Sequence, residues 1–354
     1  MIEPKRADQD NDAKRQRVIE AIEHKHTDLV PWHIDLTSAF ITKLKAQTGC
    51  EDPELFLDNH LRRAKYKQNT KLENGEELDI FGVRWSPTED GGDVGIVTGF
   101  PLKGKEGLED YRFPAIRRDF AASLCRQLAK DTSGAFRMFS LTMCFFERAW
   151  SLRGMEEILV DMCLNEAFTQ EFFEQILNHH LELLDCVLDG DYEGVYFGDD
   201  WGQQQGLIMG PPLWRKYIKP AMAKMFEKVK SRGKYVILHS CGDLREILPD
   251  IIDIGVDVYN TVQPEIYDLK QLKREYGKDL TFYGGISTQQ FLPIATPAES
   301  RKMAQDVLHL MAMHGGYILS PTHAVTPDIP VENIQALVDV ARETNLKDQG
   351  ARGL

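Results

Sequence analysis

The second half of the chain repeats one pattern, in which a short apolar segment is followed by a helical one. Strand-like apolar segments occupy residues 193–198, 235–241, 256–262, 280–286 and 316–320. Helical patterns follow them at 211–232, 244–254, 268–276, 297–313 and 331–343. The strand-like segments have few polar breaks, as strands buried on both faces of a parallel sheet do. Strands that alternate with helices in this way predict a parallel α/β fold.

The first half supplies further strands. Segments 29–34 (LVPWHI) and 136–144 (FRMFSLTMC) bring the number of strands close to the eight of a (β/α)8 barrel. Between Asp79 and Leu102, two short β segments separated by proline and glycine predict a hairpin. A doubly wound sheet is the alternative, but no GxGxxG motif follows a strand. We therefore predict an α/β fold, a (β/α)8 TIM-like barrel with a β-hairpin excursion in its N-terminal part.

The predicted domain organisation is a disordered leader at 1–17, a single barrel domain at 18–345 and a tail at 346–354. The leader is charged and contains no apolar signal core. No apolar run approaches the roughly 20 residues that a membrane span needs. The 6 cysteines are scattered without a CxxC pair, which is typical of a reducing compartment. We therefore expect a cytoplasmic protein without a membrane segment, and its oligomeric state is left open.

The charge of the chain restricts its partners. The formal net charge is −13 at pH 7. Nucleic acids and anionic membranes require clustered lysine and arginine, so neither is expected as a partner. A small-molecule substrate remains the natural expectation for a barrel of this kind.

Metal-capable side chains stand at the ends of two predicted strands. His239 and Cys241 are two residues apart, so on an extended strand their side chains leave the same face. His323 follows the last strand and is the third candidate. In a (β/α) barrel these ends meet at one rim, and imidazole and thiolate are zinc ligands. The alternative is two hydrogen-bonded rim histidines and a small buried thiol.

Carboxylates follow the strand at 193–198. Asp199 and Asp200 are adjacent, so only one of them can face the barrel centre. That residue could bind substrate, donate a proton or ligate a metal, whereas an aspartate at such a position can also cap a helix or a turn. Trp201 and the glutamines after it suggest a pocket wall.

Other polar groups at the strand ends have more than one interpretation. His33 and Asp35 share a strand face and could line the pocket, although a hydrogen-bonded core histidine is equally consistent. Gln263 ends the strand at 256–262. Glu147 and Arg148 could be site residues or only an ion pair under the rim, and we favour the ion pair.

Four segments of the second half resemble a known superfamily. They are HSCGD at 239–243, VDVYNTVQPE at 256–265, YGGIST at 283–288 and GYILSPTHAVTPDIPVENI at 316–334. With them, the chain is similar to the uroporphyrinogen decarboxylase superfamily. The resemblance implies a (β/α)8 barrel and one of two chemistries. One branch decarboxylates uroporphyrinogen, and the other contains zinc-dependent methyltransferases that work with corrinoid proteins, including aryl ether O-demethylases.

Two features favour the methyltransferase branch. The decarboxylases recognise the acidic substrate with an arginine-rich segment after the first strand, whereas no arginine occurs here between Arg17 and Arg62. The HxC motif of the methyltransferases is present as His239 and Cys241. The chain departs from that branch at the third ligand, where His323 replaces the expected cysteine.

The resemblance implies a zinc-dependent enzyme that moves a methyl group between a small methoxy or thiol compound and a corrinoid (cobalamin) carried by a partner protein. The implied zinc ligands are His239, Cys241 and His323. Asp199 or Asp200 would supply a hydrogen bond or proton, and Gln263 would orient the substrate. The implied aromatic contacts to a methoxy-aromatic compound are Trp201 and Tyr283. Two alternatives stay open, a metal-free decarboxylating lyase and a barrel that only docks a corrinoid partner.

Overall fold

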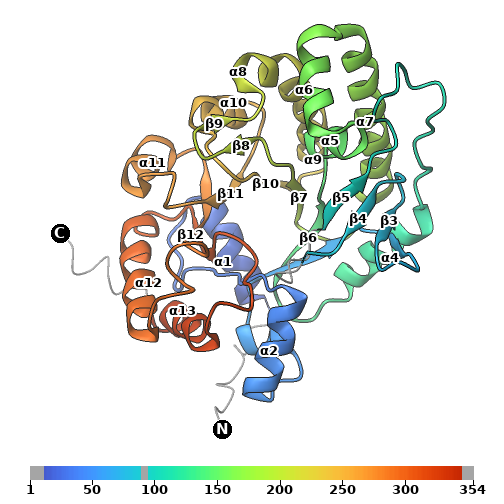
Figure 1. Cartoon of the computed structure of the whole chain (residues 1–354). Helices are drawn as coiled ribbons and strands as arrows, with labels where there is room; N and C mark the ends of the chain where they lie inside the picture. The colour runs from blue at the N-terminus through green and yellow to red at the C-terminus, as the bar shows by residue number, and fades with distance from the viewer. Residues whose placement is uncertain (1–11, 89–94, 345–354) are drawn as a thin grey trace.

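The computed structural model describes residues 12–88 and 95–344, and its centre is a curled parallel sheet (Figure 1). The strands follow the order β1-β6-β7-β10-β11-β12-β13, and every neighbouring pair is parallel. Their bounds are β1 Leu61–Lys65, β6 Phe136–Leu141, β7 Gly194–Gly198, β10 Tyr235–His239, β11 Val258–Val262, β12 Thr281–Ile286 and β13 Tyr317–Pro321. The predicted α/β class with parallel strands is confirmed.

The segment at 30–36 lies between the two edge strands of this sheet. Trp32 forms a parallel bridge with Leu319 of β13. On the other side, the His60 amide donates to the Trp32 carbonyl oxygen at 3.0 Å, directly before β1. The Phe136 amide in turn donates to the His60 carbonyl oxygen at 2.8 Å. The segment therefore connects the edges of the curled sheet, as in a TIM-like barrel.

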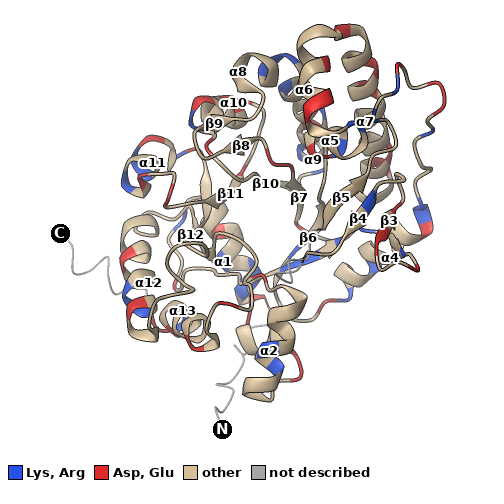
Figure 2. Cartoon of the chain, viewed as in Figure 1, with Lys and Arg blue, Asp and Glu red and all other residues tan. Residues whose placement is uncertain are grey.

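Helices cover the outer face of the sheet (Figure 1). The helices after successive strands are α4 Arg118–Ala129, α7 Glu166–Val187, α9 Lys219–Lys230, α10 Leu248–Asp253, α11 Leu269–Tyr276, α12 Pro297–Met311 and α13 Val331–Glu343. The remaining α-helices are α1 Ala13–Ile22, α2 Ser38–Thr48, α3 Pro53–Leu57, α5 Phe146–Arg153, α6 Met155–Leu164 and α8 Gly210–Leu213. Acidic and basic residues are interspersed on outer helices such as α11 and α12 (Figure 2). In the described part of the chain, no helix is long and apolar enough to cross a membrane.

A second sheet precedes β6 in the sequence. Its four antiparallel strands are β2 Asn69–Lys71, β3 Glu77–Asp79, β4 Arg84–Ser86 and β5 Ile96–Gly99, and β8 Gly202–Gln203 pairs with β9 Gly206–Leu207 elsewhere. The connection between β4 and β5 includes residues 89–94, which lie outside the described residues. Most of the expected leader and the whole expected tail also lie outside them, and α1 begins at Ala13, ahead of the expected domain start at residue 18.

The interior of the barrel has an apolar lower layer and a polar upper layer. Tyr196, Ile237 and Tyr283 belong to the lower cluster, at the amino ends of the strands. Val18 and Ile22 of α1 pack against this cluster from that end. Side chains alternate along a strand, so the residues two positions further along these strands also face inward. These upper positions are Arg63, Ser140, Gly198, His239, Asn260 and Ser320. The sheet thus presents polar groups above an apolar plug, at the carboxyl ends of its strands.

Candidate metal centre at the carboxyl ends of the strands

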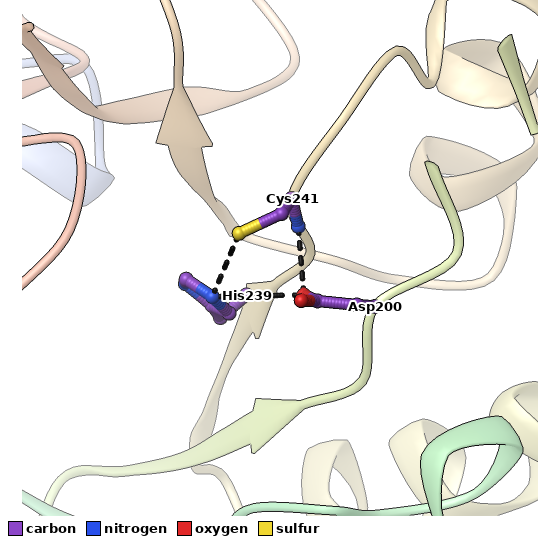
Figure 3. Close-up of side chains that lie close together, drawn as sticks. All are labelled: Asp200, His239 and Cys241. Atoms are coloured by element: carbon purple, nitrogen blue, oxygen red, sulfur yellow. Dashed lines mark hydrogen bonds and ion pairs between the residues drawn. The ribbon is translucent and has the colours of Figure 1, made fainter. Parts of the chain in front are cut away.

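His239 and Cys241 project from the end of β10 to the same side (Figure 3). The strand ends at His239, and the Ser240 amide continues the extended path by donating to the Asn260 carbonyl oxygen at 2.7 Å. The Cys241 Sγ lies 3.6 Å from the His239 Nε2. The predicted pairing of these two side chains on one strand face is therefore what the structure has.

Asp200 is the third member of the group. It follows β7, the neighbour of β10, and its Oδ1 lies 3.7 Å from the His239 Nε2. The Cys241 amide donates to the same oxygen at 2.8 Å, which holds the carboxylate beside the thiol. One donor atom from each of Asp200, His239 and Cys241 lies within 4.8 Å of the other two.

The donors of this group match the preferences of zinc. Zinc takes thiolate sulfur, imidazole nitrogen and carboxylate oxygen, usually in a tetrahedral arrangement. With bonds of roughly 2.0 to 2.3 Å, two donors of a tetrahedral site lie roughly 3.3 to 3.8 Å apart. The separations of 3.6 and 3.7 Å from the His239 Nε2 fall within that range. Three protein donors would leave one position of the metal for substrate.

His323 lies near this group without joining it. Its ring centroid is 6.4 Å from that of His239, and its side chain is exposed after β13. The structure therefore brings Asp200 together with His239 and Cys241, and the predicted ligand His323 lies beside this group. Sequence reasoning did consider Asp200 as a metal ligand, but alternation alone could not decide which of two adjacent aspartates faces the centre.

Asp199 has a different environment. Its carboxylate accepts hydrogen bonds from the backbone amides of residues 145, 146 and 147, at 2.8 to 2.9 Å. Trp201 Nε1 donates to it at 2.5 Å. Asp199 is fully buried and satisfies the free amides at the start of α5. This is the capping role that the sequence left open for one of the two aspartates.

Trp201 and Gln263 support the loops around the group. Trp201 is fully buried, and its ring packs edge-on against Trp214 at 5.3 Å. The Gln263 Oε1 accepts a hydrogen bond from the Gly242 amide at 2.8 Å, next to Cys241. Neither side chain is among the three converging donors.

His33, Asp35 and Tyr283 form a second polar cluster inside the barrel, together with Arg63. Tyr283 Oη and His33 Nδ1 share a hydrogen bond at 2.6 Å, and Asp35 pairs with Arg63. Burial, reinforced by the Arg63 charge, lowers the pKa of His33 to about 3. Although burial opposes it, Arg63 lowers the pKa of Asp35 below its usual range. The guanidinium also lies over the ring of Tyr196, 4.6 Å from its centroid.

Glu147 corrects a further expectation. We predicted that it pairs with Arg148, but Arg148 instead pairs with Asp79 at 2.8 Å. Burial raises the pKa of Glu147 well above its ordinary value, and the charge of Asp200 adds to the rise. Glu147 is thus a carboxyl group that favours its protonated form beside the three donors. Only the tertiary structure places it there, because it lies on α5, which follows β6.

Burial also shifts the pKa values of Cys241 and His239. It raises the pKa of the Cys241 thiol well above its ordinary value, with Asp200 and Glu147 adding to the effect. Burial lowers the pKa of His239, which favours the neutral imidazole. A neutral imidazole is the form that binds metals, and a divalent cation would offset the cost of a thiolate at this place.

The fold and the converging donors are those of a parallel α/β barrel with a candidate metal centre at the carboxyl ends of its strands. The chain belongs to the uroporphyrinogen decarboxylase (URO-D) family, whose model matches residues 81–344.

Curated relatives in this family carry two kinds of name. The methylcobamide:CoM methyltransferase MtaA of Methanosarcina barkeri is 30% identical over 132 residues, which cover 37% of this chain and 36% of that protein. A uroporphyrinogen decarboxylase of Magnetococcus marinus is 24% identical over 160 residues, covering 44% of this chain and 42% of that protein. The matched segments thus span less than half of either relative.

A solved structure agrees with the fold over almost the whole chain. It is that of a methyltransferase from Methanosarcina mazei, with a TM-score of 0.71 and 19% sequence identity. The superposition covers 93% of this chain and 98% of that one. At this identity the similarity establishes the TIM-like fold of the chain.

Proposed function

We propose that the protein is a zinc-dependent methyltransferase that moves a methyl group between a small methoxy or thiol compound and a corrinoid carried by a partner protein. The observation that carries this proposal is the convergence of Asp200, His239 and Cys241 within 4.8 Å. The name of the Methanosarcina barkeri relative supports the same chemistry. The proposed metal ligands are His239 and Cys241, with either Asp200 or His323 as the third.

A zinc ion held by these residues would supply a Lewis acid that stabilises negative charge on the sulfur or oxygen from which, or to which, the methyl group moves. The residues of the chain do the rest. Asp200 orients the Cys241 loop by accepting its amide. Glu147 holds a proton beside the donors, which a methoxy compound needs when its alkoxide leaves.

A second candidate function is a metal-free decarboxylation of a porphyrinogen or a smaller acid. The similarity to the Magnetococcus marinus decarboxylase favours it. Against it, no arginine lies between Arg17 and Arg62, and the buried Arg63 is already paired with Asp35. A substrate with several carboxylates would therefore lack a free arginine partner in this segment.

Metal content and methyl transfer together test the proposal. We expect about one zinc per chain in protein purified without chelator, measured by plasma mass spectrometry. His239→Ala and Cys241→Ser should lose it. Asp200→Asn and His323→Ala decide the third ligand, because only the variant that removes a ligand should lower the zinc content.

The activity assay uses the zinc-loaded protein with methylcobalamin and free thiols, followed by the visible spectrum of the cobalt centre. The reverse assay uses methoxy-aromatic compounds with reduced cobalamin. Methyl transfer that disappears in Cys241→Ser would support the proposal. A folded protein that binds no zinc after reconstitution and releases carbon dioxide from uroporphyrinogen would replace it with the decarboxylase.

A further inference from the structure

The imidazole of His239 is held from behind by Asn260. The two residues are register partners in the parallel pair β10–β11. The Asn260 Oδ1 lies 2.5 Å from the His239 Nδ1, on the side of the ring opposite the candidate metal centre. Tyr196 stacks on the same ring, with centroids 5.9 Å apart and an interplanar angle of 29°. The ring is therefore fixed by one hydrogen bond and one aromatic contact.

The orientation of the Asn260 amide follows from its other partners. Its Nδ2 donates to the backbone carbonyl oxygen of Tyr283 at 3.1 Å. A carbonyl oxygen can only accept, so the amide nitrogen has to face Tyr283. The Tyr196 hydroxyl donates to the Asn260 Oδ1 at 3.2 Å, which is consistent with the same orientation. The amide oxygen therefore faces His239.

An amide oxygen fixes the proton of its partner. A hydrogen bond between Oδ1 and Nδ1 requires a hydrogen on Nδ1, because the amide oxygen has none to give. In a neutral imidazole, the lone pair is then on Nε2. Nε2 is the atom that lies 3.6 Å from the Cys241 Sγ and 3.7 Å from the Asp200 Oδ1.

We infer that Asn260 is a positioning residue that holds His239 in the Nδ1–H tautomer, so that Nε2 is available as a metal donor before any metal binds. The hydrogen bonds alone assign the tautomer of His239. The role of this tautomer in metal binding rests on the proposed function. Asn260 acts through His239, and it is not among the three converging donors.

The choice of an amide rather than a carboxylate fits the charge of the site. Metal-binding histidines often donate to a carboxylate, which raises the basicity of the ring. Here Asp200 and a Cys241 thiolate would already supply two negative charges. A neutral acceptor orients the ring without adding a further buried charge.

Zinc affinity of the full-length protein tests the purpose of this contact, by competition with a chromophoric chelator. Asn260→Leu keeps the volume but removes the acceptor, and we expect it to weaken zinc binding about 10- to 100-fold. Asn260→Asp keeps an acceptor oxygen and should bind zinc at least as tightly as the unchanged protein. Equal affinity of a folded Asn260→Leu protein and the unchanged protein would overturn the role in metal binding.

Asn333→Leu is the matched control. Asn333 is also a buried asparagine that donates to two backbone carbonyls, those of Leu292 and Ala295. Its loss should lower the thermal stability but leave the zinc affinity unchanged. If this variant also binds zinc more weakly, the effect of Asn260→Leu would be explained by general destabilisation of the fold, and the inference would be overturned.

Histidine nitrogen spectra of the metal-free full-length protein test the tautomer itself. Long-range ¹⁵N–¹H correlations distinguish protonated from unprotonated ring nitrogens, and His239→Gln assigns the signal by its disappearance. We expect protonated Nδ1 and unprotonated Nε2 in the unchanged protein, and a mixture of tautomers in Asn260→Leu. An Nε2–H tautomer in the unchanged protein would overturn the inference, even if the protein proves to be no methyltransferase.

Discussion

At the scale of single residues, two adjacent aspartates have different environments because a strand alternates its side chains. Asp199 points toward α5 and accepts hydrogen bonds from three backbone amides, whereas Asp200 points toward His239. The sequence predicted that only one of them faces the centre, but not which one. That choice depends on the register between β7 and β10, which neighbouring strands determine.

This difference predicts that the same substitution costs much more stability at Asp199 than at Asp200. Asp199→Asn places an NH2 group among buried N–H donors, and we expect it to lower the free energy of unfolding by about 2 to 4 kcal/mol. Asp200→Asn should lower it by less than about 1 kcal/mol, because this side chain is 37% exposed. Urea unfolding of the two variants checks the prediction. A more stable Asp199→Asn than Asp200→Asn would contradict the capping role.

At the scale of elements, the candidate centre depends on the contact between two loops. The loop after β7 and the loop after β10 exchange backbone hydrogen bonds, from Gly202 N to Cys241 O at 3.2 Å and from Asp243 N to Gln203 O at 2.8 Å. Gly242 has a φ of +87°, and a Cβ placed there would lie 2.2 Å from the carbonyl carbon of Gly202. The close approach that brings Asp200 and Cys241 together thus requires glycine.

Gly242→Ala should therefore push the two loops apart. We expect a loss of about 2 to 4 kcal/mol in the free energy of unfolding, together with weaker zinc binding. Gly233→Ala is the control, because Gly233 also has a positive φ, +68°, but no atom lies within 4 Å of its added Cβ. The control should lose about 1 to 2 kcal/mol and keep its zinc affinity. Equal effects of the two substitutions on both measurements would contradict the steric argument.

At the scale of the whole molecule, the sequence predicted the class of fold well and the interior of the barrel poorly. Apolar strands with helices between them predicted the parallel sheet of the second half, and the HxC spacing predicted that His239 and Cys241 converge. Glu147 and Asn260 were not predicted as neighbours of the centre, because both reach it from other strands or helices. Contacts across a barrel leave no local pattern in the sequence.

The buried histidines predict how the stability of the whole fold depends on pH. Burial lowers the pKa of His33 and of His180 to about 3, and that of His179 to about 4. The unfolded chain binds protons near pH 6.5, whereas the folded chain does not, so acid favours unfolding. Each of these histidines should cost about 1.4 kcal/mol of stability for each pH unit below roughly 6.5, until its folded pKa is reached.

Urea unfolding at pH 7.5 and pH 5.5 measures this loss. His180→Gln should reduce the pH dependence, because it removes one of the groups that take up a proton on unfolding. A stability that rises between pH 7.5 and pH 5.5 would contradict the prediction.

The apolar plug of the barrel affects the order in which the two reactants of the proposed methyl transfer would bind. Val18 and Ile22 of α1 cover the lower end of the interior, above which the polar layer begins. Both reactants of the proposed transfer would therefore approach from the carboxyl ends of the strands. In the proposed transfer a small molecule would have to enter first, because a much larger corrinoid partner would cover these strand ends. Dissociation of the partner protein would then limit the rate of turnover.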